Sequence, residues 1–389
     1  MQISTDRILT THVGSLPRNK ELNGFLLSKE YEEPYDEGAF EAVLSAALDH
    51  AVSMQAKTGI DICGDGELPR IGFSIYAKDR MTGFDGFSKR NRTSDFINYP
   101  QYSEMFDKRV WATVERKPKV WNAPEAVGRV TYDPQLSHAR RELDGFEAAL
   151  QSTGRDVFAD SFVTAASPGV VSTTMLRAEN NPAYPTDRDY VLAVAKEMKL
   201  EYDLIVSRGH ILQLDAPDLA MDRQSLFRGR PLADFLDRIT LHIEALNIAT
   251  ADIPQERIRL HVCWGNWDGP HTEDVELEAI LPILYEAHVG AISLACANPR
   301  HQHEYKTFKA NPPPPSMSVI PGVIDVTTNF VEHPELIRQR IERFVGIVGA
   351  DRVMAGSDCG FGTFAGFGTV DPDIVYEKLC SLAEGARRV

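Results

Sequence analysis

Eight short apolar segments, each suited to a buried strand, alternate with amphipathic helical segments along the 389 residues of the chain. The expected strands are 8–16, 60–66, 158–165, 210–216, 257–264, 291–297, 318–326 and 352–357. The expected helices are 37–58, 187–207, 231–250, 273–287, 334–348 and 372–386. Because repeated strand–helix units build a parallel sheet and eight of them close it, the sequence predicts an α/β fold, a (β/α)8 TIM barrel.

Residues 71–150 interrupt this rhythm after the second expected strand. They are rich in charged and aromatic residues, in runs such as KRNRTSDFINYPQY and VERKPKVWNAP. The segment has too few apolar residues for a large core of its own, so we predict an insertion that covers the barrel mouth. The whole chain, 1–389, is then a single domain, and a separate domain at 71–150 is the less favoured alternative.

The charge of the chain argues against some classes of partner. It carries 41 Lys and Arg against 56 Asp and Glu, a net charge of −15, and no basic run offers a face for nucleic-acid phosphates. No apolar stretch reaches the roughly 18 residues that span a bilayer, and the first residues lack an apolar signal core. We expect a cytoplasmic protein with reduced cysteines and a small-molecule substrate, without nucleic-acid or membrane partners. Association into a homo-oligomer stays open.

The segment HVCWGNWDGPH at 261–271 carries the strongest chemical signal. Side chains two apart on a strand point the same way, so His261 and Cys263 should face one side at the end of the fifth strand. Barrel enzymes hold their catalytic groups at that end. An imidazole and a thiolate at this spacing suit Zn²⁺. Since an isolated His-x-Cys is more often a pair of core residues, a second feature is needed.

The second feature is GSDCGFGTFAG at 356–366, which places Cys359 just past the eighth strand among glycines. Strands five and eight lie across the barrel from each other, so His261, Cys263 and Cys359 can converge on one metal ion. Catalytic zinc keeps three protein ligands and one open position. We therefore predict a zinc site with these three ligands, completed by the sulfur of a substrate.

These motifs resemble the C-terminal catalytic half of cobalamin-independent methionine synthase, and more closely its single-barrel relatives, which include epoxyalkane:coenzyme M transferase. The resemblance extends over nearly the whole chain. It rests on THVGSLPR (11–18), GDGELPR (64–70), LQLDAP (212–217), HVCWGN (261–266), ANPRHQHE (297–304), PGVIDVTTN (321–329) and SDCGFGT (357–363), which occur in the order of the family.

The resemblance implies a zinc-dependent alkyltransferase in which the three predicted ligands form the catalytic centre. Its substrates would be a small thiol, such as homocysteine or coenzyme M, and an alkyl donor, and its product a thioether. Ser15 would contact the carboxylate of an amino-acid thiol, and Glu67 and Asp215 would hold its ammonium group, since carboxylates suit a cation. Without the resemblance, a turn or helix-capping role for the two acids is as good an interpretation.

Two departures from the family pattern bear on the substrates. Ala295 stands where methionine synthase has a glutamate ligand, so the fourth ligand is open among water, the substrate and, less favoured, Cys296. Thr327 stands where methionine synthase has a histidine linked to proton delivery to the folate. A hydroxyl does not titrate near neutral pH, so methyltetrahydrofolate becomes a less favoured donor.

Two other functions stay open. One is a metal-independent enzyme similar to uroporphyrinogen decarboxylase, in which Asp215 would contact the substrate. The other is a non-catalytic zinc- or thiol-binding barrel with a closed site. The His-x-Cys pair with a distant cysteine argues against the first. Within the transferase hypothesis the identities of the thiol and the donor stay open, and the candidates for a general acid are His12, His210 and His301.

Overall fold

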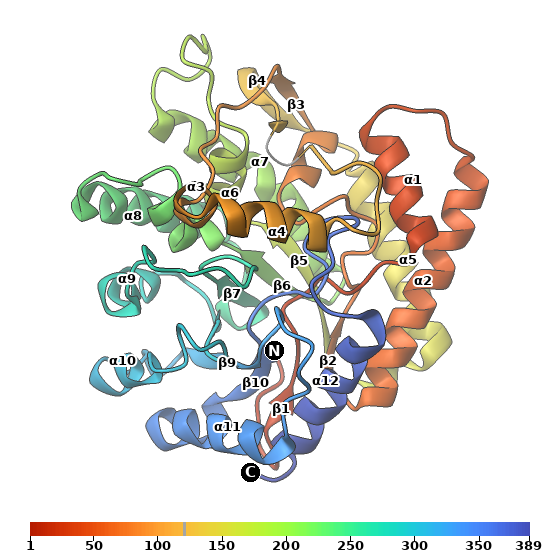
Figure 1. Cartoon of the computed structure of the whole chain (residues 1–389), viewed down its shortest axis with the longest axis vertical. Coiled ribbons are helices and arrows are strands. Elements are labelled where there is room, and N and C mark those ends of the chain that lie inside the picture. Colours follow the sequence, from red (N-terminus) through yellow and green to blue (C-terminus); the bar gives the residue numbers. More distant parts are fainter. Residues whose placement is uncertain (120–121) are drawn as a thin grey trace.

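The computed structural model describes residues 1–119 and 122–389 and forms an eight-stranded parallel barrel with helices around it (Figure 1). The strands are β1 (Leu9–Thr10), β2 (Ile62–Gly64), β5 (Asp160–Ala166), β6 (Ile211–Asp215), β7 (Ile258–Val262), β8 (Ala291–Leu294), β9 (Ser318–Ile324) and β10 (Met354–Ser357). They pair in the order β1-β10-β9-β8-β7-β6-β5-β2. A parallel bridge between Thr11 and Ile62 joins the two end strands. The predicted TIM barrel is confirmed, with every expected strand present.

Helices surround the barrel. They are α1 (Lys20–Glu30), α2 (Glu37–Thr58), α5 (Ser137–Thr153), α6 (Pro168–Thr174), α7 (Asp187–Ser207), α8 (Leu232–Ala249), α9 (Leu277–Leu284), α10 (Tyr305–Ala310), α11 (Pro334–Val348) and α12 (Pro372–Ala386). The expected helices are all present, as α2, α7, α8, α9, α11 and α12. Side-chain caps fix several of their starts: Asp36 accepts from the Ala39 amide, and Thr186 and Asp189 form a capping box. The helix expected at 273–287 spans only Leu277–Leu284, and Asp274 lies before it, bonded to two histidines.

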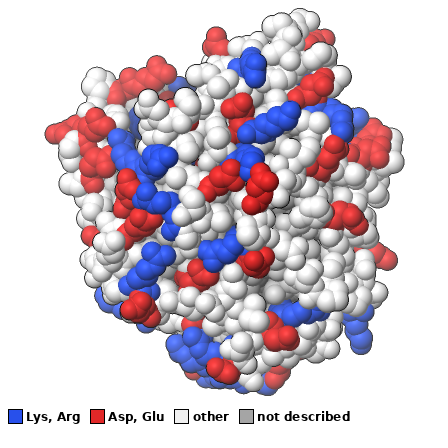
Figure 2. Space-filling view, turned by 180° about the vertical axis from the view of Figure 1, so that it is seen from behind, with Lys and Arg blue, Asp and Glu red and all other residues white. Residues whose placement is uncertain are grey.

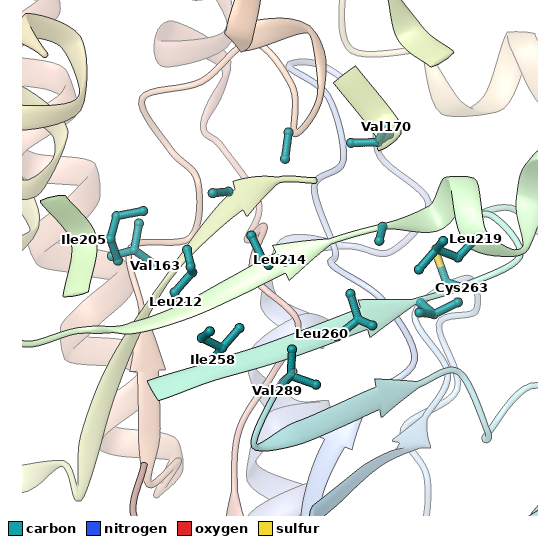
Figure 3. Packing of buried hydrophobic residues seen from close by; sticks show 14 of the residues in the cluster. Val163, Val170, Ile205, Leu212, Leu214, Leu219, Ile258, Leu260, Cys263 and Val289 are labelled. Carbon is teal, nitrogen blue, oxygen red and sulfur yellow. The ribbon is translucent and has the colours of Figure 1, made fainter. Parts of the chain in front are cut away.

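The barrel interior is apolar at one end and polar above it. Seven strands each contribute one residue to an apolar layer: Leu9, Ile62, Phe162, Ile211, Ala291, Ile320 and Met354. Arg259 of β7 lies over the Phe162 ring at 3.7 Å, and its Nε donates to Gln213 Oε1 at 2.7 Å. Other strand residues, such as Val163, Leu214 and Leu260, pack in the main hydrophobic core (Figure 3). Arg259 and Gln213 thus form a polar layer between the apolar layer and the carboxyl ends of the strands.

The segment between β2 and α5 adds further elements to the barrel. It contains η1 (Ile75–Asp79), β3 (Met81–Asp85), α3 (Ser94–Asn98), α4 (Pro100–Val110) and β4 (Glu125–Tyr132), and β3 pairs with β4 antiparallel. In Figure 1, α3 and α4 cross in front of the strands. The predicted insertion 71–150 also includes most of α5, which packs against α2 and α7 in the barrel wall. We therefore propose that the covering insertion ends before α5 begins at Ser137.

Buried charges tie the insertion to the barrel wall. Glu142 of α5 accepts from Arg70 Nε at 3.0 Å and pairs with Arg80. Arg80 also pairs with Glu201 of α7 at 3.0 Å, and the Tyr76 hydroxyl donates to Glu201 at 2.9 Å. The two arginine side chains are only 2% and 3% exposed. The first part of the insertion is therefore fixed to helices α5 and α7 by buried ion pairs and a hydrogen bond.

None of the helices in the described ranges is both long and apolar enough to cross a bilayer. On the face shown in Figure 2, Lys and Arg side chains are interspersed with Asp and Glu. That face therefore presents no continuous basic surface.

Candidate metal centre

Three side chains bring metal-binding atoms together at the carboxyl end of the barrel. His261 lies on β7, Cys263 just beyond it and Cys359 just beyond β10. One ligand atom from each lies within 4.8 Å of the others, and the two sulfurs are 3.9 Å apart. Figure 3 shows Cys263 at the carboxyl end of β7. The fold thus joins the His-x-Cys pair to the distant cysteine, as the strand order requires.

The chemistry of this trio fits a zinc ion. Both ring nitrogens of His261 are buried, and neither has a hydrogen-bond partner among the described residues. The adjacent Cys359 thiol and the His261 imidazole hold the pKa of Cys263 well below its usual range, although burial opposes this. A buried imidazole without a partner is costly, and a metal cation satisfies it. One imidazole and two cysteine sulfurs are ligands that Zn²⁺ prefers.

Asp358 fixes the loops around the trio. Its carboxylate accepts from the backbone amides of Cys296, Ala297 and Asn298 at 2.8, 2.7 and 2.8 Å. Since Asp358 directly precedes Cys359, these bonds hold the loop after β8 against the loop after β10. The loop after β8 is therefore held in place through its backbone amides, and none of its side chains belongs to the trio.

Two cavities share Cys263 and Cys359 as lining residues, and the two departures from the family pattern line the second of them. This cavity of about 450 Å³ is lined by Ala295, Thr327 and both cysteines of the trio. The Cys296 thiol is buried in the hydrophobic core and does not join the trio in the group of metal-binding atoms found among the described residues. The Thr327 hydroxyl donates to Asp325 at 2.8 Å.

The predicted substrate-binding residues line the first cavity, of about 150 Å³, together with the trio. Ser15 Oγ accepts from the Gly362 amide at 3.2 Å. Glu67 has a left-handed backbone, with φ of 54°, and its Oε1 lies so close to Gly14 that a Cβ there would be 2.4 Å away. Glu67 Oε2 is buried without a partner among the described residues. Such an acceptor at a cavity surface suits a ligand with N–H groups.

Glu67 and Asp215 are two buried acids beside one another. Burial and the nearby charge of Asp215 raise the pKa of Glu67 to about 8, and burial raises the pKa of Asp215 to about 6. Gln213 Nε2 donates to Asp215 Oδ1 at 2.7 Å, and Gln213 is itself held by Arg259. A cationic group bound between the two acids would stabilise their charged forms.

Sequence reasoning missed several residues of the site. Gln213 bonds Asp215, and Arg259 bonds Gln213. Only the alternation of side chains along the strands could have indicated that Gln213 and Arg259 point into the barrel. Asn266 donates to the Gly360 carbonyl and to Thr363 Oγ1, both at 2.7 Å, and so joins the loops after β7 and β10. The position of Asn266 in the motif HVCWGN was the sequence signal that could have indicated its place in the site. Aromatic residues of the insertion also line the first cavity.

Of the candidate general acids, only His301 lines either of the two cavities at the trio. Its ring nitrogens bond Asp274 at 2.8 Å and Glu304 at 3.0 Å, and its ring stacks on Trp264 at 4.0 Å. Although burial opposes it, the two carboxylates raise the pKa of His301 to about 9. With both nitrogens bonded to carboxylates, His301 holds the loops around the second cavity together.

Comparison with known proteins assigns the family. A family model described as "Cobalamin-independent synthase, Catalytic domain" matches residues 170–370, which is more than half of the chain and includes the trio. The chain belongs to the cobalamin-independent methionine synthase catalytic-domain family. This methionine synthase family member is 24% identical over 390 residues to 2-hydroxypropyl-CoM lyase of Xanthobacter autotrophicus, covering 92% of this chain and 88% of the lyase.

Other members of the methionine synthase family match over similar lengths. The methionine synthase of Saccharolobus solfataricus is 23% identical, covering 98% of this chain and 94% of that protein. The structure of a B12-independent methionine synthase from a Shewanella species, in complex with selenomethionine, matches with a TM-score of 0.68 at 19% identity, covering 98% of this chain and 97% of that one. The family resemblance expected from the motifs is confirmed, and the structural match supports the same fold.

Proposed function

We propose that this protein is a zinc-dependent thiol S-alkyltransferase, which activates a small thiol for attack on an alkyl donor and produces a thioether. The observation that carries the proposal is the buried trio of His261, Cys263 and Cys359, with both His261 nitrogens unpartnered within the described structure. Two relatives support it by name, a 2-hydroxypropyl-CoM lyase and a methionine synthase. The family membership argues against the alternative similar to uroporphyrinogen decarboxylase.

The chain would contribute positioning and a protected cavity to this reaction. A Zn²⁺ ion held by the trio would lower the pKa of a substrate thiol, so that the sulfur is a thiolate at neutral pH. The sulfur forms a bond to the donor carbon, and the leaving group departs with the electron pair of the bond that breaks.

The acids of the first cavity favour an amino-acid thiol of the homocysteine class. Glu67 Oε2 lacks a partner among the described residues, and Asp215 is oriented by Gln213, so both carboxylates are available to an ammonium group. The Ser15 hydroxyl, which lines the same cavity, would donate to the substrate carboxylate. Coenzyme M, which has no ammonium group, is the second candidate thiol.

Metal analysis of the purified chain tests the proposal. We expect about one zinc per chain, lost in Cys263→Ser and Cys359→Ser and retained in Cys380→Ser, which changes an exposed cysteine away from the site. Metal-free wild-type protein would contradict the proposal. Zinc-dependent alkylation is then sought by mass spectrometry with homocysteine and coenzyme M against epoxide, methyl-folate and methyl-corrinoid donors.

A cobalt-substituted sample separates the transferase from a non-catalytic zinc protein. In the transferase a thiol enters the coordination sphere, so adding homocysteine or coenzyme M should change the visible absorption of the bound Co²⁺. A spectrum that none of the thiols changes would indicate a closed, non-catalytic site.

A further inference from the structure

The first cavity carries a feature that the metal centre and the thiol contacts do not require. Seven aromatic side chains line it, and Phe73 lies beside Phe364 with ring centroids 5.7 Å apart. We call the other six, whose rings contact one another, the aromatic wall: Phe96, Phe106, Trp111, Trp267, Phe364 and Phe367. Ring centroids of successive members lie 5.1 to 6.3 Å apart, as in Phe96 with Phe106 and in Phe364 with Phe367.

Half of the aromatic wall comes from the insertion, and the wall lines the same cavity as the trio. Phe96 and Phe106 come from α3 and α4. Trp267 follows the His-x-Cys pair, and its indole Nε1 donates to Asp95 at 2.9 Å, which turns its ring toward Phe96. A residue that does not line the cavity therefore fixes the Trp267 ring of the wall.

Three members of the wall leave apolar surface open. Trp111, Phe364 and Phe367 are only partly buried, whereas most rings of this size in the core are fully covered. Trp111 meets Phe367 at an interplanar angle of 74°, and Phe364 meets Phe367 at 79°. Ring edges and faces presented in this way are complementary to a further aromatic ring, and covering them with an apolar group is favourable.

The two arginines that line the same cavity each have a nearby carboxylate. The Arg92 guanidinium lies 5.4 Å from the centre of the Phe96 ring and faces Asp107 at 3.9 Å, and Arg90 interacts with Asp222. Since these acids balance the cations, the wall is suited to an uncharged group.

A single aromatic ring that adjoins the reacting carbon matches the aromatic lining, because the wall and the trio line the same cavity.

We propose that the alkyl group handled by this enzyme carries one uncharged aromatic ring, which binds against the aromatic wall while the sulfur lies at the trio. This inference rests on the proposed function and names its donor class, a benzyl-type compound R–X. The new C–S bond forms at the carbon next to the ring, the C–X bond breaks, and X leaves with its electron pair while the thiol proton passes to solvent.

Calorimetric binding of two product-like thioethers to the metal-loaded full chain tests this. S-benzyl-L-homocysteine should bind at least about 10-fold more tightly than L-methionine, because the added ring is buried against the wall. Trp111→Ala and Phe367→Ala should each weaken S-benzyl-L-homocysteine binding roughly 10-fold and leave methionine binding within about 2-fold. Tyr35→Ala, which truncates a half-buried ring remote from the cavity, should change neither.

Equal or weaker binding of the benzyl compound, or equal losses for both thioethers in the wall variants, would overturn the inference. Benzyl methyl sulfide, which lacks the amino-acid part, should compete with S-benzyl-L-homocysteine even if the roles of Glu67 and Asp215 are wrong. Zinc content is measured on the same samples. Absence of zinc would refute the proposed function, whereas the affinity ratio of the two thioethers decides the inference about the wall.

Discussion

Glu142→Gln should cost the protein about 3 kcal/mol of stability and loosen the insertion. Although burial opposes it, Arg70 and Arg80 lower the pKa of Glu142 from 4.5 to about 2. That change corresponds to roughly 3.4 kcal/mol, at about 1.36 kcal/mol per tenfold change in the ionisation constant. The Glu142 side chain is 14% exposed, so solvent screens the pairs only slightly. Removing the carboxylate also leaves two buried cations without this partner, which agrees with a loss of this size.

The sign of the pH dependence follows from the lowered pKa. A carboxyl group whose pKa is lower in the folded state stabilises the protein above its unfolded value of 4.5. The contribution is lost as the pH falls from 4.5 toward 2. By pH 3 about 2 kcal/mol of it should be gone. In Glu142→Gln this part of the acid sensitivity should be missing.

Urea unfolding between pH 7 and pH 3, followed by circular dichroism, measures both effects. Glu104→Gln is the matched control, because Glu104 pairs with Lys108 on the surface with both side chains largely exposed, and should cost under about 0.5 kcal/mol. The reasoning fails if Glu142→Gln costs no more than this control, or if the variant loses stability with falling pH as steeply as the wild type.

Three further outcomes are expected. Gly265→Ala should lower the midpoint of thermal unfolding by several degrees, because a Cβ there would lie 1.8 Å from the Trp267 ring and the backbone has φ of 117°. Gly128→Ala is the control and should be near neutral, because a Cβ there would have no neighbouring atom within 4 Å. His301 should stay protonated to about pH 9 in NMR titration, and Asp274→Asn should lower its pKa; an unchanged titration would contradict the pairing. Removing the metal with a chelator should lower the thermal midpoint and added zinc should restore it, because a ligand of the native state stabilises that state; an unaltered midpoint would count against a bound metal.

The sequence carried most of the barrel because the signals involved are local. Strand and helix periodicity and caps such as Asp36 act within a few residues, and they located β7 and α2 well. The helix α5 was assigned to the insertion because its charged residues, Glu142 among them, obscured an apolar face. Glu142 bonds Arg70 and Arg80, which come from elsewhere in the chain.

The site was predictable in part for the same reason. His261 and Cys263 lie two apart on one strand, and the barrel order brings Cys359 to them. The aromatic wall was not predictable, since it unites residues of the insertion with residues after β7 and β10. Its members are brought together by tertiary packing, and sequence spacing gives no signal for such a cluster.

The two cavities that meet at the cysteines of the trio imply an unusual inhibition pattern. Cys263 and Cys359 line both cavities, but the aromatic wall belongs mainly to the first, and the second is lined by polar residues such as Asn298 and Asp325. In the proposed transferase, a small polar chelator could reach a metal ion held by these cysteines through the second cavity while a thioether occupies the first. Such a compound should inhibit non-competitively with respect to the proposed alkyl donor, and an apolar ring compound should inhibit competitively.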